Sequence, residues 1–294
     1  MNLEKEPPSY PWTKYFMAAA VRALRRVHDE YVVSSLPPLW DQGSPTVERS
    51  CLTRGVGLEY APEVSVCAAI AQEFRRSNLG AGVWIPATNS KGVNVQAGVR
   101  NWKVEVEHPI KLTTDDGPPT QAYVDMVLQR VNFDDRKIKS ERKKDMAGYA
   151  PVFLEAKRVR RGSRRSGLKG TNYVDMYDDA NKLVIARDNA TGAYKKQYRN
   201  HFETESAPFI HLLLWNCCEA GKVRRDSGEM PHDILKQIES KGLQGSGSAK
   251  RYDRLRINAM DWFPTDWPSS KVNRPAVKIS RIAWVALIEV VPVE

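Results

Sequence analysis

The sequence predicts an α/β (α+β) fold in which a central mixed β-sheet is flanked by helices. Several segments repeat apolar residues every three or four positions, as amphipathic helices do. Other short segments are continuously apolar or alternate strictly, which is typical of strands. The 294 residues, of which 41% are hydrophobic, suffice for one large domain or two small ones. We expect a helical extension and linker over residues 1–50 and one sheet-containing domain over residues 51–294.

Four segments have the apolar spacing of helices. In the first, Phe16, Ala20 and Leu24 form one stripe and arginines lie on the other side. Residues 36–47 are rich in Pro, Gly and Ser and are interpreted as a linker or surface loop. The predicted helices cover residues 12–33, 62–76, 173–187 and 231–240.

The strand-like segments differ in character. WKVEVEHPI alternates as an antiparallel strand does, whereas PFIHLLLWNCC is typical of a fully buried strand, so His211 within it is expected to be a hydrogen-bonded core residue. Trp262, Phe263 and Trp267 form an aromatic block that either stacks unpaired bases or, as we favour, packs against the sheet edge. The predicted strands cover residues 82–87, 93–99, 102–110, 122–131, 151–157, 208–218 and 278–293.

Two neighbouring strands carry charges in an apolar context. Asp125 is enclosed by apolar residues, and a charge buried in such a run is costly unless it has a metal or a partner. The strand PVFLEAK ends in Glu155 and Lys157, which share one face of an extended chain. An ordinary cross-strand charge pair is the alternative reading of these two residues. The same Asp/Glu-x-Lys spacing recurs at Asp135, Glu141 and Glu239, in charged or amphipathic segments.

An Asp inside one apolar strand followed by Glu-x-Lys at the end of the next resembles the PD-(D/E)xK nuclease superfamily, which has the restriction-endonuclease-like fold. The resemblance covers roughly residues 60 to 220, and Val124 stands where the family has a proline. It implies that Asp125 and Glu155 bind metal, with the backbone carbonyl of Ala156 as a third ligand, and that Lys157 is the family's lysine. The family often adds a glutamate on the preceding helix, for which Glu73 is the candidate.

The resemblance implies a Mg²⁺-dependent enzyme, with Mn²⁺ as an alternative metal, that hydrolyses phosphodiester bonds of DNA, or of RNA. Paired carboxylates holding Mg²⁺ can activate a water and neutralise charge on the phosphate. Lys157 would position or help deprotonate that water, and Glu73 would hold a second metal or else pair with Arg76. We expect an endonuclease of restriction, phage defence or recombination, acting as a homodimer or with a partner subunit. The alternative is an inactive nucleic-acid-binding or assembly subunit.

Charge favours a nucleic-acid partner. The formal net charge is +10 and the isoelectric point is near 9.4. In residues 157–169, seven of thirteen side chains are basic and none is acidic, so this segment is expected to contact phosphates, the alternative being a basic surface loop without a ligand. The expected nucleic-acid-binding residues are Arg158, Arg160, Arg161, Arg164, Arg165 and Lys169.

Cysteine usage and the apolar segments indicate the compartment. The four cysteines show no CxxC spacing and are expected to be free, buried thiols of a reducing cytoplasm. The N-terminal residues lack the basic start and apolar core of a signal peptide. No run approaches the roughly 20 apolar residues of a membrane span. We therefore expect a soluble, cytoplasmic protein with no membrane partner.

Overall fold

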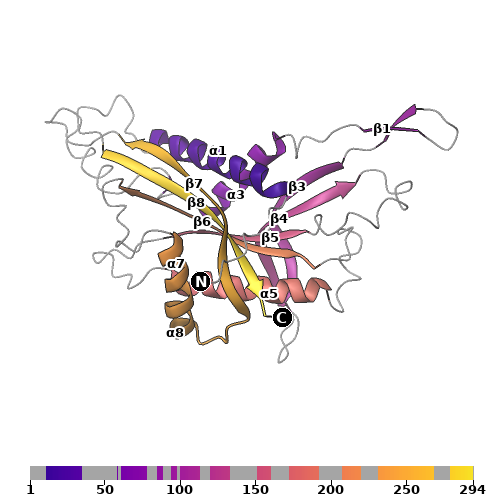
Figure 1. The fold of residues 1–294 in the computed structure, drawn as a ribbon. Coiled ribbons are helices and arrows are strands. Elements are labelled where there is room, and N and C mark those ends of the chain that lie inside the picture. Colours follow the sequence, from indigo (N-terminus) through magenta and orange to yellow (C-terminus); the bar gives the residue numbers. More distant parts are fainter. Residues whose placement is uncertain are drawn as a thin grey trace, which may run out of the picture.

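The computed structural model contains a six-stranded mixed sheet with helices on both faces, as the sequence predicts (Figure 1). No helix within the described ranges is long and apolar enough to cross a membrane. The structure describes residues 11–34, 58, 61–77, 85–88, 94–97, 100–112, 120–132, 151–159, 172–191, 207–219, 231–267 and 279–293.

The sheet has the strand order β3-β4-β5-β6-β8-β7. β5 and β6 are parallel and every other neighbouring pair is antiparallel. The parallel pair requires a crossover connection, which contains helix α5 (Tyr173–Thr191). β1 (Ile85–Thr88) and β2 (Asn94–Ala97) form a separate antiparallel pair. The six strands are β3 (Arg100–Leu112), β4 (Thr120–Asn132), β5 (Val152–Arg158), β6 (Phe209–Glu219), β7 (Tyr252–Trp267) and β8 (Ile279–Pro292).

Helices α1 (Pro11–Ser34) and α3 (Glu63–Arg75) pack against each other and cover one face of the sheet (Figure 1). Trp12 and Phe16 of α1 are fully buried in the same core as Trp215 of β6. The predicted N-terminal extension therefore supplies part of the core of the sheet domain, because its apolar stripe needs a partner surface.

The opposite face is covered by α5 (Tyr173–Thr191) and by α7 (Pro231–Gln237), which continues through the π-helical turn η5 (Ile238–Gly242) into α8 (Leu243–Ser246). Gly242 lets η5 approach α5 closely, because a Cβ at this position would clash with the side chain of Tyr177. The α7–α8 unit thus braces α5, the helix that carries two residues of the site described below.

The sequence patterns predicted no strand over residues 252–259, the first half of β7. Register shifts between Tyr252 and Arg254 and between Ile257 and Ala259 interrupt the strand, so its side chains do not alternate regularly and the sequence signal is weak. The aromatic block at the end of β7 packs in the sheet as favoured: Phe263 is buried, and the rings of Trp262 and Trp284 lie 6.5 Å apart.

His211 is fully buried on β6, and its Nε2 lies 3.2 Å from the side-chain amide nitrogen of Asn258. Burial and, to a smaller extent, the nearby charge of Arg256 together lower the pKa of His211 to about 3. The ring is therefore neutral near pH 7, which confirms the prediction of a hydrogen-bonded core histidine.

Candidate active site

The candidate site lies where β4 separates from β5. The two strands pair over only three residues of β5, Val152 to Leu154. Main-chain groups at Pro151 and Val159 bond to β6. Because the N–H and C=O of one residue point to the same side of a strand, the even-numbered residues between them direct both groups toward β4.

Two carboxylates occupy the place that β4 leaves. The N–H of Ala156 donates to Asp125 Oδ2 at 2.8 Å, and the N–H of Arg158 donates to Glu63 Oε1 at 3.2 Å. Both oxygens stand in for the carbonyls of a neighbouring strand. The carbonyl of Ala156 points to the same side as its N–H and therefore faces Asp125 as well.

An irregularity in the β3–β4 hairpin brings Asp125 to this opening. Val124 packs in the core beneath α5, whereas Met126 packs in the core beneath α1 and α3. A regular strand would place residues two apart on one face, so the alternation reverses at Asp125. Opposite it on β3, Glu107 lies between two paired positions and has φ of 53°, an uncommon value for a residue with a side chain.

Glu155 and Lys157 share the α5-facing side of β5, as predicted, and each pairs with residues from other elements. Glu155 is only 1% exposed, and Lys182 Nζ of α5 lies 2.7 Å from its Oε1. Lys157 Nζ lies 3.2 Å from Asp179 Oδ2 of α5 and 3.6 Å from Glu63 Oε2 of α3. The two residues thus belong to a network that joins β5 to both layers of helices.

The cluster contains more carboxylates than ammonium groups. Burial raises the pKa of Glu155 well above its usual value, and the nearby charge of Asp125 raises it further against the opposing effect of Lys182. Burial would lower the pKa of Lys157, but Asp179 and Glu63 outweigh it and hold the pKa above its usual value. The four carboxylates are Glu63, Asp125, Glu155 and Asp179, and the two lysines are Lys157 and Lys182.

The donor set fits a hard divalent cation. Asp125, Glu155 and the Ala156 carbonyl offer oxygen ligands, which Mg²⁺ prefers, and Mg²⁺ keeps several waters of its own. Among the described residues, no group of three or more His, Cys, Asp and Glu side chains is arranged to hold a metal ion. The expected set needs only two such side chains together with one main-chain oxygen.

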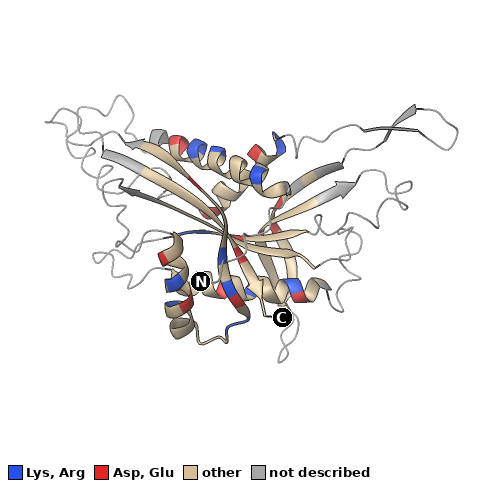
Figure 2. Cartoon of the chain, viewed as in Figure 1, with Lys and Arg blue, Asp and Glu red and all other residues tan. Residues whose placement is uncertain are grey.

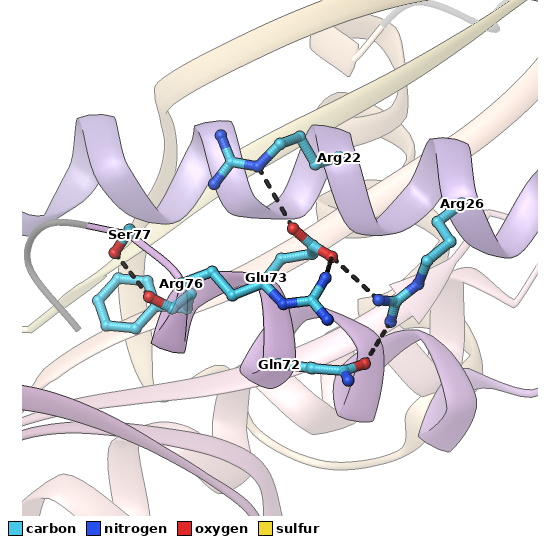
Figure 3. Close-up of polar contacts among 7 residues, drawn as sticks. Arg22, Arg26, Gln72, Glu73, Arg76 and Ser77 are labelled. Carbon is cyan, nitrogen blue, oxygen red and sulfur yellow. Dashed lines mark hydrogen bonds and ion pairs between the residues drawn. The ribbon is translucent and has the colours of Figure 1, made fainter. Parts of the chain in front are cut away.

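The structure does not bring Glu73 to the cluster. Glu63 and Glu73 are ten residues apart on α3, about 15 Å along its axis. The Glu73 carboxylate is held by Arg22, Arg26 and Arg76 (Figure 3). The pairing with Arg76 that the sequence left open is therefore present, and the helix glutamate at the cluster is Glu63.

Sequence reasoning missed three members of the cluster. Two glutamates, Glu63 and Glu73, lie on α3, and the sequence does not show which end of this helix lies over the cluster. Glu63 was missed for this reason. Asp179 and Lys182 are three residues apart and border the apolar stripe of α5 that includes Ala180 and Leu183. A charged i, i+3 pair beside a buried stripe was the available signal.

Only one of the predicted nucleic-acid-binding residues falls in the described part of the chain. The Arg158 guanidinium donates to the carbonyl of Leu58 at 3.1 Å, and the side chain is half-buried. Arg158 is thus tied to the segment before α3. Outside the described residues lie Arg160, Arg161, Arg164, Arg165 and Lys169.

Comparison with known proteins adds no relative from which a role could be transferred. The chain matches no protein-family model, no curated protein and no solved structure. The function is therefore argued from the chemistry of the cluster.

Proposed function

We propose that the protein is a Mg²⁺-dependent nuclease, also active with Mn²⁺, that hydrolyses phosphodiester bonds of DNA as an endonuclease. The observation that carries the proposal is the convergence of Asp125, Glu155 and the Ala156 main chain at the opening between β4 and β5, in a cluster where carboxylates outnumber lysines. The resemblance to the PD-(D/E)xK superfamily supports the same residues, and that superfamily also has a helix after this strand, the position of α5 after β5.

Asp125, Glu155 and the carbonyl of Ala156 would hold the metal, which when bound polarises the phosphate and lowers the pKa of a coordinated water. Lys157 would act as a fixed positive charge beside the scissile phosphate, because Asp179 and Glu63 keep its pKa raised and its ammonium protonated. Glu63 and Asp179 are positioning residues, since both contact Lys157 and so set where its charge lies.

Lys182 supplies the positive charge that the buried Glu155 requires without metal. A cation bound between Asp125 and Glu155 would compete with Lys182 for the same carboxylate. Metal binding would therefore shift Lys182 toward Asp179, which its ammonium already approaches at 3.8 Å.

The same contact favours a second candidate, an inactive nucleic-acid-binding or assembly subunit with this fold. In such a protein the Lys182–Glu155 ion pair would take the place of the metal permanently. The two candidates differ in whether the cluster binds a divalent cation at all.

DNA as the partner is supported by the net charge of +10 and by the basic residues Arg160, Arg161, Arg164, Arg165 and Lys169. Cutting both strands of a duplex usually takes two active sites, so we propose that a homodimer or a partner subunit supplies the second site.

The test combines Mn²⁺ binding, followed by calorimetry, with cleavage of plasmid, linear duplex and single-stranded DNA and of RNA. We expect binding and DNA cleavage by the wild type, both lost in Asp125→Asn and Glu155→Gln. Asp188→Asn is the matched control, because this carboxylate is exposed on α5. Cleavage that persists in EDTA would overturn the metal mechanism, and absence of both binding and cleavage would favour the inactive subunit.

A further inference from the structure

Three guanidinium groups converge on one carboxylate at the α1–α3 contact (Figure 3). Arg26 Nη1 lies 2.9 Å from Glu73 Oε1, Arg76 Nη1 lies 3.0 Å from the same oxygen, and Arg22 Nε lies 3.4 Å from Oε2. Arg26 also donates to the side chain of Gln72 at 2.8 Å. Glu73 therefore fixes three positive charges from two helices in one place.

This arginine cluster, Arg22, Arg26 and Arg76, has more hydrogen-bond donors than its contacts use. Each guanidinium carries five N–H donors, and the acceptors around them are Glu73, Gln72 and the exposed Glu30. The side chains of Arg22 and Arg76 are 50% and 62% exposed, whereas that of Glu73 is 10% exposed. The carboxylate is thus covered, and the outward-facing donors can reach an anion.

The helix contact does not need three arginines. Phe16 of α1 and Phe74 of α3 are fully buried with their rings 6.3 Å apart, so the two helices already share an apolar interface. Bringing like charges together costs electrostatic energy. Figure 2 shows Lys and Arg residues on several turns of α1 and acidic residues near its end, so basic residues outnumber acidic ones on this helix.

The arginine cluster and the candidate active site lie toward opposite ends of one rigid element. Glu63 at the start of α3 contacts Lys157, and Glu73 near its end holds the arginines, about 15 Å away along the helix axis. Successive phosphates on one strand of a duplex are about 3.4 Å apart along its axis. About four to five base pairs therefore span the separation.

We propose that Arg22, Arg26 and Arg76, held in place by Glu73, bind the phosphate backbone of the nucleic acid whose scissile bond lies at the β4–β5 opening. The choice of ligand rests on the proposed function. Guanidinium groups suit this role because they remain charged and bind phosphate oxygens through two parallel hydrogen bonds. Contacts to phosphates give affinity and position without reading sequence.

The test measures equilibrium binding of a fluorescent DNA duplex by anisotropy, in EDTA and over a series of salt concentrations. Each lost phosphate contact lowers the slope of log K against log salt by about 0.9. We expect the double variant Arg22→Ala/Arg76→Ala to lower the slope by about 1.8. The matched control is Arg254→Ala, an exposed arginine of β7 whose loss should leave the slope unchanged.

The double variant Arg22→Lys/Arg76→Lys separates binding from folding, because it keeps both charges and should retain the wild-type slope. An unchanged slope in the alanine variant would overturn the proposal. Equal losses in the alanine and lysine variants would also overturn it, because the positions would then act through the fold. Binding in EDTA is measured without cleavage. A wild type that binds DNA through these arginines but never cleaves it would contradict the proposed nuclease activity and would still support phosphate binding by the arginine cluster.

Discussion

Two buried glutamates organise clusters of opposite imbalance. Glu73 and Glu155 are 8% and 1% exposed, and both are held by cationic side chains from neighbouring elements. Around Glu73, guanidinium groups are in excess and point outward. Around Glu155, carboxylates are in excess, and two of them, Asp125 and Glu63, occupy the opening between β4 and β5.

The difference shows that burial of a charged residue does not by itself identify its role. A buried ion pair contributes little net stability, because desolvation offsets the attraction between the charges. What distinguishes the two clusters is the sign of the charge left over. An excess of carboxylates calls for a cation, and an excess of arginines calls for an anion.

The largest expected effect is on catalysis by the Glu155 cluster. Asp125→Asn and Glu155→Gln should each lower the cleavage rate by about three orders of magnitude or more, because each removes a metal ligand. Without metal, both variants should be as stable as the wild type or more so, since two repelling carboxylates become one. Cleavage rate and thermal midpoint, each with and without Mg²⁺, check this. Cleavage by Glu155→Gln at a rate near that of the wild type would contradict the assignment of Glu155 as a metal ligand.

Lys157→Ala should lower the cleavage rate by about two orders of magnitude. It should also reduce the metal-free unfolding free energy by about 1 kcal/mol, because Asp179 and Glu63 lose a shared counter-charge. Single-turnover cleavage and denaturant unfolding measure the two effects. A variant that is destabilised but cleaves at the wild-type rate would reduce Lys157 to a structural charge.

Glu73→Gln should lower stability and leave catalysis intact, the reverse of the effect expected for the two metal-ligand variants. Removing this carboxylate leaves three arginines close together, at a cost of about 2 kcal/mol of unfolding free energy, a figure reduced by the exposure of Arg22 and Arg76. The cleavage rate per folded molecule at saturating DNA should not change, since Glu73 lies outside the β4–β5 opening, whereas the DNA affinity should change because Glu73 holds the arginine cluster. Denaturant unfolding and cleavage of the same preparation check both halves. Loss of cleavage with unchanged stability would return Glu73 to the active site.

Lys182→Met should lower the metal-free unfolding free energy by about 1.5 kcal/mol, because Glu155 loses its closest positive charge. Saturating Mg²⁺ should shrink this difference, since a bound cation replaces the lysine. Thermal unfolding of wild type and variant across a Mg²⁺ titration measures it. A difference that Mg²⁺ does not change would mean that metal and lysine do not compete for Glu155.

The effect that is smallest at neutral pH concerns His211, a buried group that belongs to neither cluster. Its pKa is about 3 in the folded protein against about 6.5 when unfolded, so the unfolded chain takes up the proton first as pH falls. Stability from this group is therefore lost between about pH 6.5 and pH 3, by up to about 1.4 kcal/mol per pH unit. His211→Gln should remove this slope in urea unfolding measured across that range. An identical slope in the variant would assign the acid sensitivity to other groups.

Local patterns predicted much of the fold because the helices have regular apolar stripes and most strands are apolar or alternate. The first half of β7 was not predicted, because its register shifts break the alternation of apolar and polar side chains. Asp125, Glu155 and Lys157 could be selected from sequence because charges in apolar strands are conspicuous. Glu63 could not, because its contact with Lys157 depends on where α3 begins over the sheet, whereas the i, i+3 spacing of Asp179 and Lys182 was a local signal for those two residues.

The short pairing between β4 and β5 also has a mechanical consequence. Three residue pairs between β4 and β5 join the β3–β4 hairpin to the rest of the sheet. The hairpin can therefore pivot about this short pairing, which ends beside Asp125. Lys182 links the two sides of the β4–β5 opening, because its ammonium donates to the Tyr123 carbonyl on the hairpin and pairs with Glu155 on β5. A ligand that displaces Lys182 from Glu155 would therefore weaken the link between the hairpin and β5. Movement of the hairpin would in turn change the distance between Asp125 and Glu155.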